Sequence, residues 1–239
     1  MATLIALLIA DCAPPDNTWL LDRARHHSIN LRDRFESLDQ LEDVDRVIAT
    51  ERQAVELTPN DHLDMPFRLS KLGGSLSSRF ERLRDLQDLD EALAAERRAV
   101  NLTPEDSPRM PLRLRELGKS LSFRFARRGE LQDLEEALAV MRRAVDLTSD
   151  DHPNLPMALD ILGLLLHSHF MRLGNFADLE QAIEKKHRVI ELTPDDHPNM
   201  PIRLSSLERS LSLRFDRLGE LQNLEDAIAV QRRAIDLTP

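Results

Sequence analysis

The sequence predicts an all-α fold, an α-solenoid of five αα-hairpins with an N-terminal half-repeat helix. Three observations predict it: a repeat of constant length, apolar residues at helical spacing, and turn residues at fixed places in each repeat. The tripeptide Leu-Thr-Pro or a close relative ends at Pro59, Pro104, Ser149, Pro194 and Pro239, each 45 residues after the last. A fixed period of this length indicates one structural unit stacked on copies of itself.

The same period predicts a single repeat domain over residues 1–239. Its units are a degenerate half-repeat at 1–14 and repeats at 15–59, 60–104, 105–149, 150–194 and 195–239. Residues 1–10 are almost entirely apolar, but no basic residue precedes them and the run is too short to span a bilayer. We therefore expect this segment to be a capping helix of the stack and not a signal peptide.

Each repeat carries two apolar stripes at three- and four-residue spacing, which indicates two amphipathic helices. In residues 60–104 the first stripe consists of Leu69, Leu72, Leu76, Phe80 and Leu83, and the second of Leu86, Leu89, Ala92, Leu93 and Val100. The turn between the helices has Gly129, Gly174 or Gly219, and a proline opens each following first helix at Pro66, Pro111, Pro156 and Pro201. One such hairpin cannot bury its apolar face alone, so the hairpins must stack.

An acidic residue recurs near the start of each second helix, at Asp43, Asp88, Asp133 and Asp178, with Asn223 in the last repeat. Negative charge is favourable at a helix N-terminus. We interpret this series mainly in that way.

Composition and motifs exclude several functions. A formal net charge of −10 argues against nucleic-acid binding, and the single cysteine, Cys12, suits a reducing, cytoplasmic setting. His62, His152 and His197 lie one repeat apart in successive linkers, too far from one another to share a metal ion. The common catalytic and phosphate-binding motifs are missing, so we expect no enzyme activity, no cofactor, no metal and no membrane partner.

The repeat resembles the tetratricopeptide repeat, from about Trp19 to the C-terminus. Leu69, Leu72-Gly73 and Leu76 match its first helix, and Ala92, Ala99 and Pro104 match its second helix and exit. Units lengthened in this way are similar to those of kinesin light chains and of the arrays beside fungal caspase-like CHAT protease domains. The resemblance implies a right-handed solenoid whose first helices line a concave binding surface. Ser28 and Glu208 replace the Gly of the Leu-Gly pair in the first and fifth repeats, so closer packing is expected in the middle three.

The resemblance also implies which side chains face that concave surface. The partner-binding candidates are Arg25, Ile29, Arg32, Phe67, Ser70, Arg115, Lys119, Phe123, Asp160, Leu164, His167, Arg209 and Leu213, with Leu112, Met157 and Ile202 at the same surface. The basic members favour an acidic peptide, and the apolar members favour anchoring of its side chains. Two interpretations of the charges stay open, ligand binding and simple hydration of the groove.

Two further features have alternative explanations. The first helix of the fourth repeat is nearly all apolar from Ile161 to Leu166, which is explained by deeper burial or by a partner surface. The last hairpin has no polar helix after it, which predicts self-association through its apolar face.

The sequence therefore predicts a cytoplasmic protein-interaction scaffold that binds a peptide or partner domain, as the regulatory portion of a larger signalling protein. The alternatives are the regulatory array of a CHAT protease whose catalytic domain lies outside these residues, and a purely structural oligomerising element.

Overall fold

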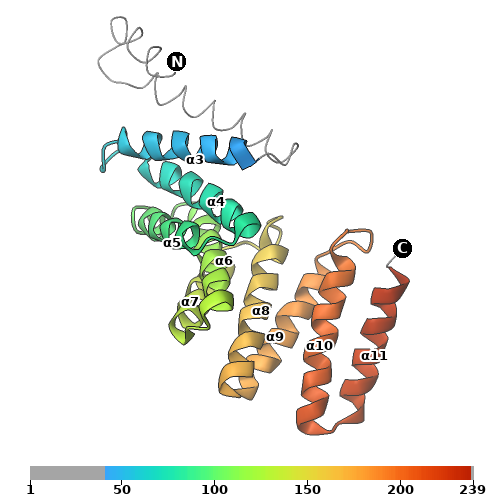
Figure 1. Ribbon diagram of the computed structural model, residues 1–239. Coiled ribbons are helices and arrows are strands. Elements are labelled where there is room, and N and C mark those ends of the chain that lie inside the picture. The colour runs from blue at the N-terminus through green and yellow to red at the C-terminus, as the bar shows by residue number, and fades with distance from the viewer. Residues whose placement is uncertain (1–40, 238–239) are drawn as a thin grey trace, which may run out of the picture. The chain divides into compact units, whose positions relative to one another are not determined.

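The computed structural model describes residues 41–237 and consists, over that range, of α-helices joined by short turns and linkers (Figure 1). The prediction of an all-α chain of repeated hairpins is confirmed there. The predicted half-repeat at 1–14 and the predicted first helix of repeat 15–59 lie outside the described residues. By internal contacts the chain divides into two compact units at the Pro104–Glu105 bond, and each unit is treated by itself below.

The helices alternate between 19-residue first helices, here A helices, and 16-residue second helices, here B helices. The first unit contains α3 (Leu41–Glu56), a B helix, and hairpin 2, which is α4 (Met65–Leu83) with α5 (Leu86–Asn101). The second unit contains hairpin 3, α6 (Met110–Arg128) with α7 (Leu131–Asp146), hairpin 4, α8 (Leu155–Leu173) with α9 (Phe176–Glu191), and hairpin 5, α10 (Met200–Leu218) with α11 (Leu221–Asp236).

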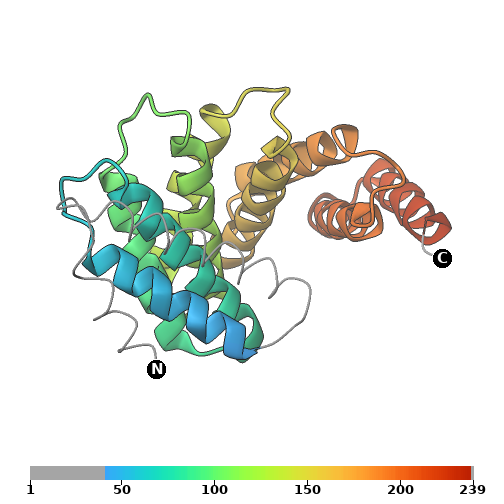
Figure 2. The same ribbon diagram turned by 90° about the horizontal axis from the view of Figure 1, so that it is seen from above.

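Within each unit, an A helix packs on the B helix of its own hairpin and on the B helix before it. In the first unit α4 contacts both α3 and α5, and in the second unit α8 contacts α7 and α9 while α10 contacts α9 and α11. Both views show α8 beside α9 and α10 beside α11 (Figures 1 and 2). The predicted stripe residues Leu69, Leu72, Leu76 and Phe80 are buried. Burial of these stripes between neighbouring helices is the main stabilising contribution.

The turn residues act at the helix ends as the sequence predicts. Gly129, Gly174 and Gly219 end the A helices with φ of 71°, 71° and 69°, a left-handed conformation that glycine adopts without steric cost. Arg84 takes the same conformation in hairpin 2 with φ of 61°. Each A helix from α4 to α10 has a proline in its first turn.

The glycine of the Leu-Gly pair lets a B-helix side chain cross close over the A helix. A Cβ atom on Gly118 would lie 2.4 Å from Met141 Sδ, and one on Gly73 would lie 2.6 Å from Glu96 Cγ. At Gly163 the nearest atom, Lys186 Cγ, would be 3.2 Å away. The close helix contact predicted at these three glycines is thus present, and it is tightest in hairpins 2 and 3.

The recurrent aspartates of the B helices do more than the sequence interpretation allowed. Asp133 is 2% exposed and accepts two hydrogen bonds from Arg124, at 2.9 Å from Nε and 2.6 Å from Nη2. Asp88 and Arg79 form the same fork at 2.9 and 2.5 Å, and these bonds raise the pKa of Arg79. The interpretation of these residues mainly as N-terminal charge was therefore incomplete, because Asp88 and Asp133 also tie their helices to the A helix of the same hairpin.

The later hairpins vary this pair in both partners. In hairpin 4 His169 Nδ1 lies 2.7 Å from Asp178 Oδ2. In hairpin 5 the aspartate is replaced by Asn223, and Arg214 donates instead to Glu180 of α9 at 3.3 Å. Hairpins 2 to 4 thus keep a polar pair at this position, whereas in hairpin 5 Arg214 pairs with the preceding B helix and Asn223 donates to Glu220.

Replacing Asp133 with alanine is expected to lower the free energy of unfolding by about 3 kcal/mol, because the guanidinium of Arg124 loses its buried counter-charge. Urea denaturation followed by circular dichroism measures the change. Glu135→Ala, an exposed position on the same helix, is the control and is expected to change it by less than about 0.5 kcal/mol. Equal midpoints for the two variants would contradict the structural role assigned to the pair.

Candidate functional site

The structure places the partner-binding candidates of the described residues on A helices. Phe67 and Ser70 lie on α4, Arg115, Lys119 and Phe123 on α6, Asp160, Leu164 and His167 on α8, and Arg209 and Leu213 on α10. Arg25, Ile29 and Arg32 lie outside the described residues. Three of the four helices, α6, α8 and α10, belong to the second unit.

One register of these A helices exposes a large apolar side chain in every hairpin of the second unit. Leu112 is 40% exposed, Met157 50% and Ile202 70%, and each directly follows the proline of its helix. Leu164 adds a further side chain at 48% exposure. Leu213, in contrast, is half-buried and packs against the core of the last two hairpins. The α6, α8 and α10 residues at this register are called the apolar register below.

The nearly all-apolar segment of α8 is for the most part core. Leu162, Leu165 and Leu166 are buried and Ile161 is half-buried, which leaves Leu164 as its exposed member. Deeper burial therefore explains most of this segment, and the partner-surface explanation applies to Leu164.

Basic side chains lie beside the apolar residues. Arg115 donates to Glu116 at 2.6 Å and its side chain is 12% exposed. The Lys119 ammonium lies 5.3 Å from the centre of the Phe123 ring, within the range of a cation–π interaction, and Lys71 lies 5.6 Å from that of Phe67. Arg209 is exposed on α10.

A buried polar cluster joins hairpins 4 and 5, and it includes the predicted residue His167. Lys186, on α9, is 3% exposed, and its aliphatic chain passes over Gly163. Its ammonium donates to Ser206 O at 2.9 Å and to Ser210 Oγ at 2.6 Å, both on α10. Ser210 Oγ lies in turn 3.0 Å from His167 Nδ1 on α8. One chain of hydrogen bonds thus connects three helices.

The hydrogen bonds are consistent with a neutral His167. Ser210 Oγ accepts from Lys186 and still has its own proton, so the geometry fits donation of that proton to Nδ1 of a neutral imidazole. Burial, followed by the charges of Lys186 and Arg209, lowers the pKa of His167 to about 4. Burial and the charge of Arg209 lower the pKa of Lys186 to about 8, although Asp160 opposes that change. Burial also raises the pKa of Asp160.

The cluster brings a serine, a lysine and a histidine together, a set of residues that nucleophilic enzymes also use. Ser210 is fully buried, however, so no substrate reaches its hydroxyl in this arrangement. The geometry fits a polar contact between hairpins. Sequence reasoning found His167 and Asp160 and missed Lys186 and Ser210, although a lysine at the register of Glu96 and Met141 was a visible signal.

The linker histidines have a local structural role. His62, His152 and His197 each accept, through Nδ1, the backbone N–H of the residue two positions later, at 3.1 Å. This bond satisfies a donor next to the start of the following A helix. Over residues 41–237 no three His, Cys, Asp or Glu side chains are grouped as metal ligands, and no helix in that range has the length and apolar character to cross a membrane.

Solved structures with this arrangement of helices are repeat proteins. The chain is 15% identical to a kinesin light chain protein of Podospora anserina with nearly identical TPR-like repeats, with a TM-score of 0.61 over 88% of this chain and 96% of that one. For MamA the identity is 16% and the TM-score 0.58, over 86% and 92% of the two chains. For BtubC (BKLC) of P. vanneervenii the identity is 14% and the TM-score is 0.59, over 91% of this chain and 89% of that one.

The chain has the tetratricopeptide-like solenoid fold. This confirms the all-α solenoid and the tetratricopeptide-like character inferred from the sequence, while the similarity to CHAT-associated arrays stays a prediction. No protein-family model matches the sequence, and a search of curated proteins found no similar one. At these identities the likeness establishes the fold alone, and the ligand of this tetratricopeptide-like chain must be argued from its own side chains.

The polar cluster predicts how stability changes with pH. Lys186 has a pKa of about 8 in the folded chain against 10.5 for a free lysine. Between these values the unfolded chain binds the extra proton, so this residue makes the free energy of unfolding rise with pH from about 8 to 10.5. His167, at about 4 against 6.5, makes it fall as the pH drops from 6.5 to 4.

Lys186→Met, which introduces the residue found at Met141, should abolish the alkaline rise and leave stability at pH 7 unchanged or higher. Thermal unfolding at a series of pH values measures both. Lys185→Met is the control, because Lys185 pairs with Glu184 on the same helix and lies outside the cluster. Superimposable profiles for Lys186→Met and the unmodified chain would show that Lys186 titrates normally.

Proposed function

We propose that this chain is a protein-interaction scaffold that binds a peptide or a partner domain along the face formed by α6, α8 and α10. One observation carries the proposal: Leu112, Met157 and Ile202 repeat an exposed apolar side chain at one register of three successive A helices. Core packing does not account for side chains exposed by 40 to 70%. A partner would bury them, and binding energy at interfaces is concentrated in such anchors.

Charge supports an acidic partner. Arg115, Lys119 and Arg209 lie on the same helices as the apolar register, although the whole chain has a formal net charge of −10. A local excess of basic side chains on an acidic protein attracts acidic ligands selectively and speeds their association. A cytoplasmic location, a regulatory position in a larger signalling protein and an association with a CHAT protease stay predictions from the sequence.

A second candidate function is assembly through α11. Ile183 and Ile190 on α9 are 4% and 9% exposed, whereas Ile228 and Ile235, at the same registers of α11, are 40% and 65% exposed. The face of α9 is covered by α10. A second copy of this chain, presenting its own α11 face, would bury the same apolar area in an isologous dimer.

Charge reversal at the three basic positions tests the leading proposal. Peptides of about twelve residues are selected on the unmodified chain by display, and their affinity is measured by fluorescence anisotropy. The triple variant Arg115→Glu, Lys119→Glu and Arg209→Glu should weaken the acidic peptides at least tenfold, because charge-assisted hydrogen bonds are lost.

The matched control reverses three exposed B-helix arginines, Arg98, Arg188 and Arg232, which changes the net charge equally. It should leave affinity within about twofold apart from long-range effects that salt screens. Two results would reject binding at this face. One is that the selected peptides bind the A-helix charge-reversal variant as tightly as the unmodified chain, and the other is that both variants lose affinity equally.

Assembly through α11 has its own measurement. Sedimentation velocity at increasing concentration should show a dimer for the unmodified chain and a monomer for Ile228→Asp with Ile235→Asp. Ile202→Asp, an equally exposed residue on α10, should leave the dimer intact. A monomer at all concentrations, or a dimer that survives the α11 substitutions, would exclude this interface.

A further inference from the structure

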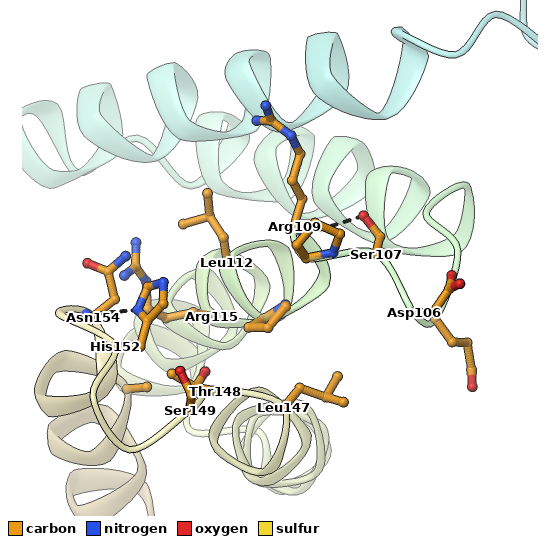
Figure 3. A pocket seen from close by; sticks show the side chains of 14 residues that line it. Asp106, Ser107, Arg109, Leu112, Arg115, Leu147, Thr148, Ser149, His152 and Asn154 are labelled. Carbon is orange, nitrogen blue, oxygen red and sulfur yellow. Dashed lines mark hydrogen bonds between the residues drawn. The ribbon is translucent and has the colours of Figure 1, made fainter.

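A pocket of about 430 Å³ lies in the second unit between hairpins 3 and 4. It is bordered by the linkers before α6 and α8, the first turns of those helices and the end of α7. Figure 3 shows Leu112, Arg115, Thr148 and His152 among the side chains that surround it. Ala158, on α8, forms part of its lining.

A missing arginine accounts for part of this space. Ala158 is the counterpart of Arg68, Arg113 and Arg203 in the other repeats, and Arg68 and Arg113 are 6% and 7% exposed. Arg203 donates to Thr193 Oγ1 at the end of the preceding B helix. Thr148, the counterpart of Thr193, is only half-buried, whereas Thr193 is 6% exposed. The alanine therefore leaves open the volume that an arginine side chain fills between hairpins 4 and 5.

The charges at this junction are also exchanged. Between hairpins 4 and 5, Arg203 Nε lies 4.0 Å from Asp160 Oδ2. The counterpart of Asp160 one repeat earlier is Arg115, so a basic side chain stands where the other junction has an acidic one. Arg115 donates through Nη2 to Glu116, the next residue of its own helix. Adjacent residues on a helix point in different directions, so this pair does not replace a carboxylate across the junction.

Apart from the acidic residues Glu105 and Asp106, the remaining lining suits a carboxylate with an apolar neighbour. His152 Nδ1 accepts the backbone N–H of Asn154, which leaves Nε2 as the protonated nitrogen of the neutral ring. Arg109 also borders the pocket, but its guanidinium points away from Arg115 and His152 (Figure 3). Burial, followed by the charge of Arg109, lowers the pKa of Arg113. Glu105 at the rim is paired with Arg143 at 3.1 Å. Leu112, Leu147 and the ring of Pro111 supply apolar contact.

We infer that this pocket binds an acidic side chain of a bound peptide, its carboxylate held by Arg115 and His152 and its neighbouring apolar residue placed against Leu112 and Leu147. This inference rests on the proposed function and adds to it a specific place and a ligand chemistry. At the next junction Asp160 faces Arg203. Here Arg115 stands at the position of Asp160, so the ligand carboxylate would lie beside Ala158, where Arg203 lies at the next junction, with the charges of the pair exchanged.

Methyl NMR of the full chain tests the inference with a defined probe, acetyl-Glu-Leu-amide. The probe should shift the methyl signals of Leu112, Leu147 and Ala158 in a saturable manner, and acetyl-Gln-Leu-amide should bind at least tenfold more weakly because it lacks the charge. Acetyl-leucine, with a terminal carboxylate, and inorganic phosphate are the further arms, and they distinguish a side-chain carboxylate from other anions. Met157 and Ile202 report on the rest of the A-helix face.

Two variants distinguish the pocket from general electrostatic attraction. Ala158→Arg fills the space with the side chain of the other repeats, so it should abolish probe binding even though it adds positive charge. Arg115→Gln keeps the space open and should weaken binding of the probe at least tenfold. This variant tests the inference even if Ala158→Arg does not fold. Arg209→Gln, outside the pocket, should change nothing.

Each possible result either supports or overturns the inference. Loss of the probe in Ala158→Arg and Arg115→Gln supports the inference. Tighter binding in Ala158→Arg, equal affinity for the Glu and Gln probes, or preference for phosphate would overturn it. Shifts confined to Met157 and Ile202 would also overturn it while leaving the scaffold function in place. The proposed function is tested separately, by the display selection of peptides on the unmodified chain. If that selection yields no binding peptide, the scaffold function is rejected independently of the pocket.

Discussion

The structure depends on one constraint: a two-helix hairpin of this length cannot bury its apolar residues within itself. Leu69, Leu72 and Leu76 of α4 are covered from two directions, by α5 of the same hairpin and by α3 before it. Each hairpin therefore needs a neighbour, and the repeats carry similar apolar stripes because the junctions within each unit solve the same packing problem. Positions within the stripes are restricted to residues that fill this space, while positions outside them are free to differ.

Changes of residue type at these restricted, buried positions alter the chemistry of the chain more than changes at exposed positions do. The register that crosses the A-helix glycine holds Glu96, Met141 and Lys186 in successive hairpins, all buried. Each side chain crosses the glycine of its own hairpin, but its tip is an acid, a thioether or a base. Only the lysine draws Ser210 and His167 into a hydrogen-bonded chain. A fold that repeats its backbone thus places different chemistry at each junction.

The absence of an arginine at position 158 follows the same logic. The hairpins on either side are held by their own stripes, and large-to-small changes are only partly filled by relaxation of the surroundings. The space beside Ala158 belongs to a pocket of about 430 Å³. A pocket in a solenoid can arise in this way from one residue that departs from the repeat.

The sequence by itself determined the helical hairpins, their ends and their apolar faces, because these depend on residues at most four positions apart and on the turn chemistry of Gly129 or Pro156. It also determined which candidate side chains lie on A helices, through the 45-residue period. The tertiary structure decided which groups pair. Arg124 with Asp133, Lys186 with Ser210, and the open volume between Thr148 and Ala158 depend on how separate helices meet, and no local pattern records the distance between side chains on different helices.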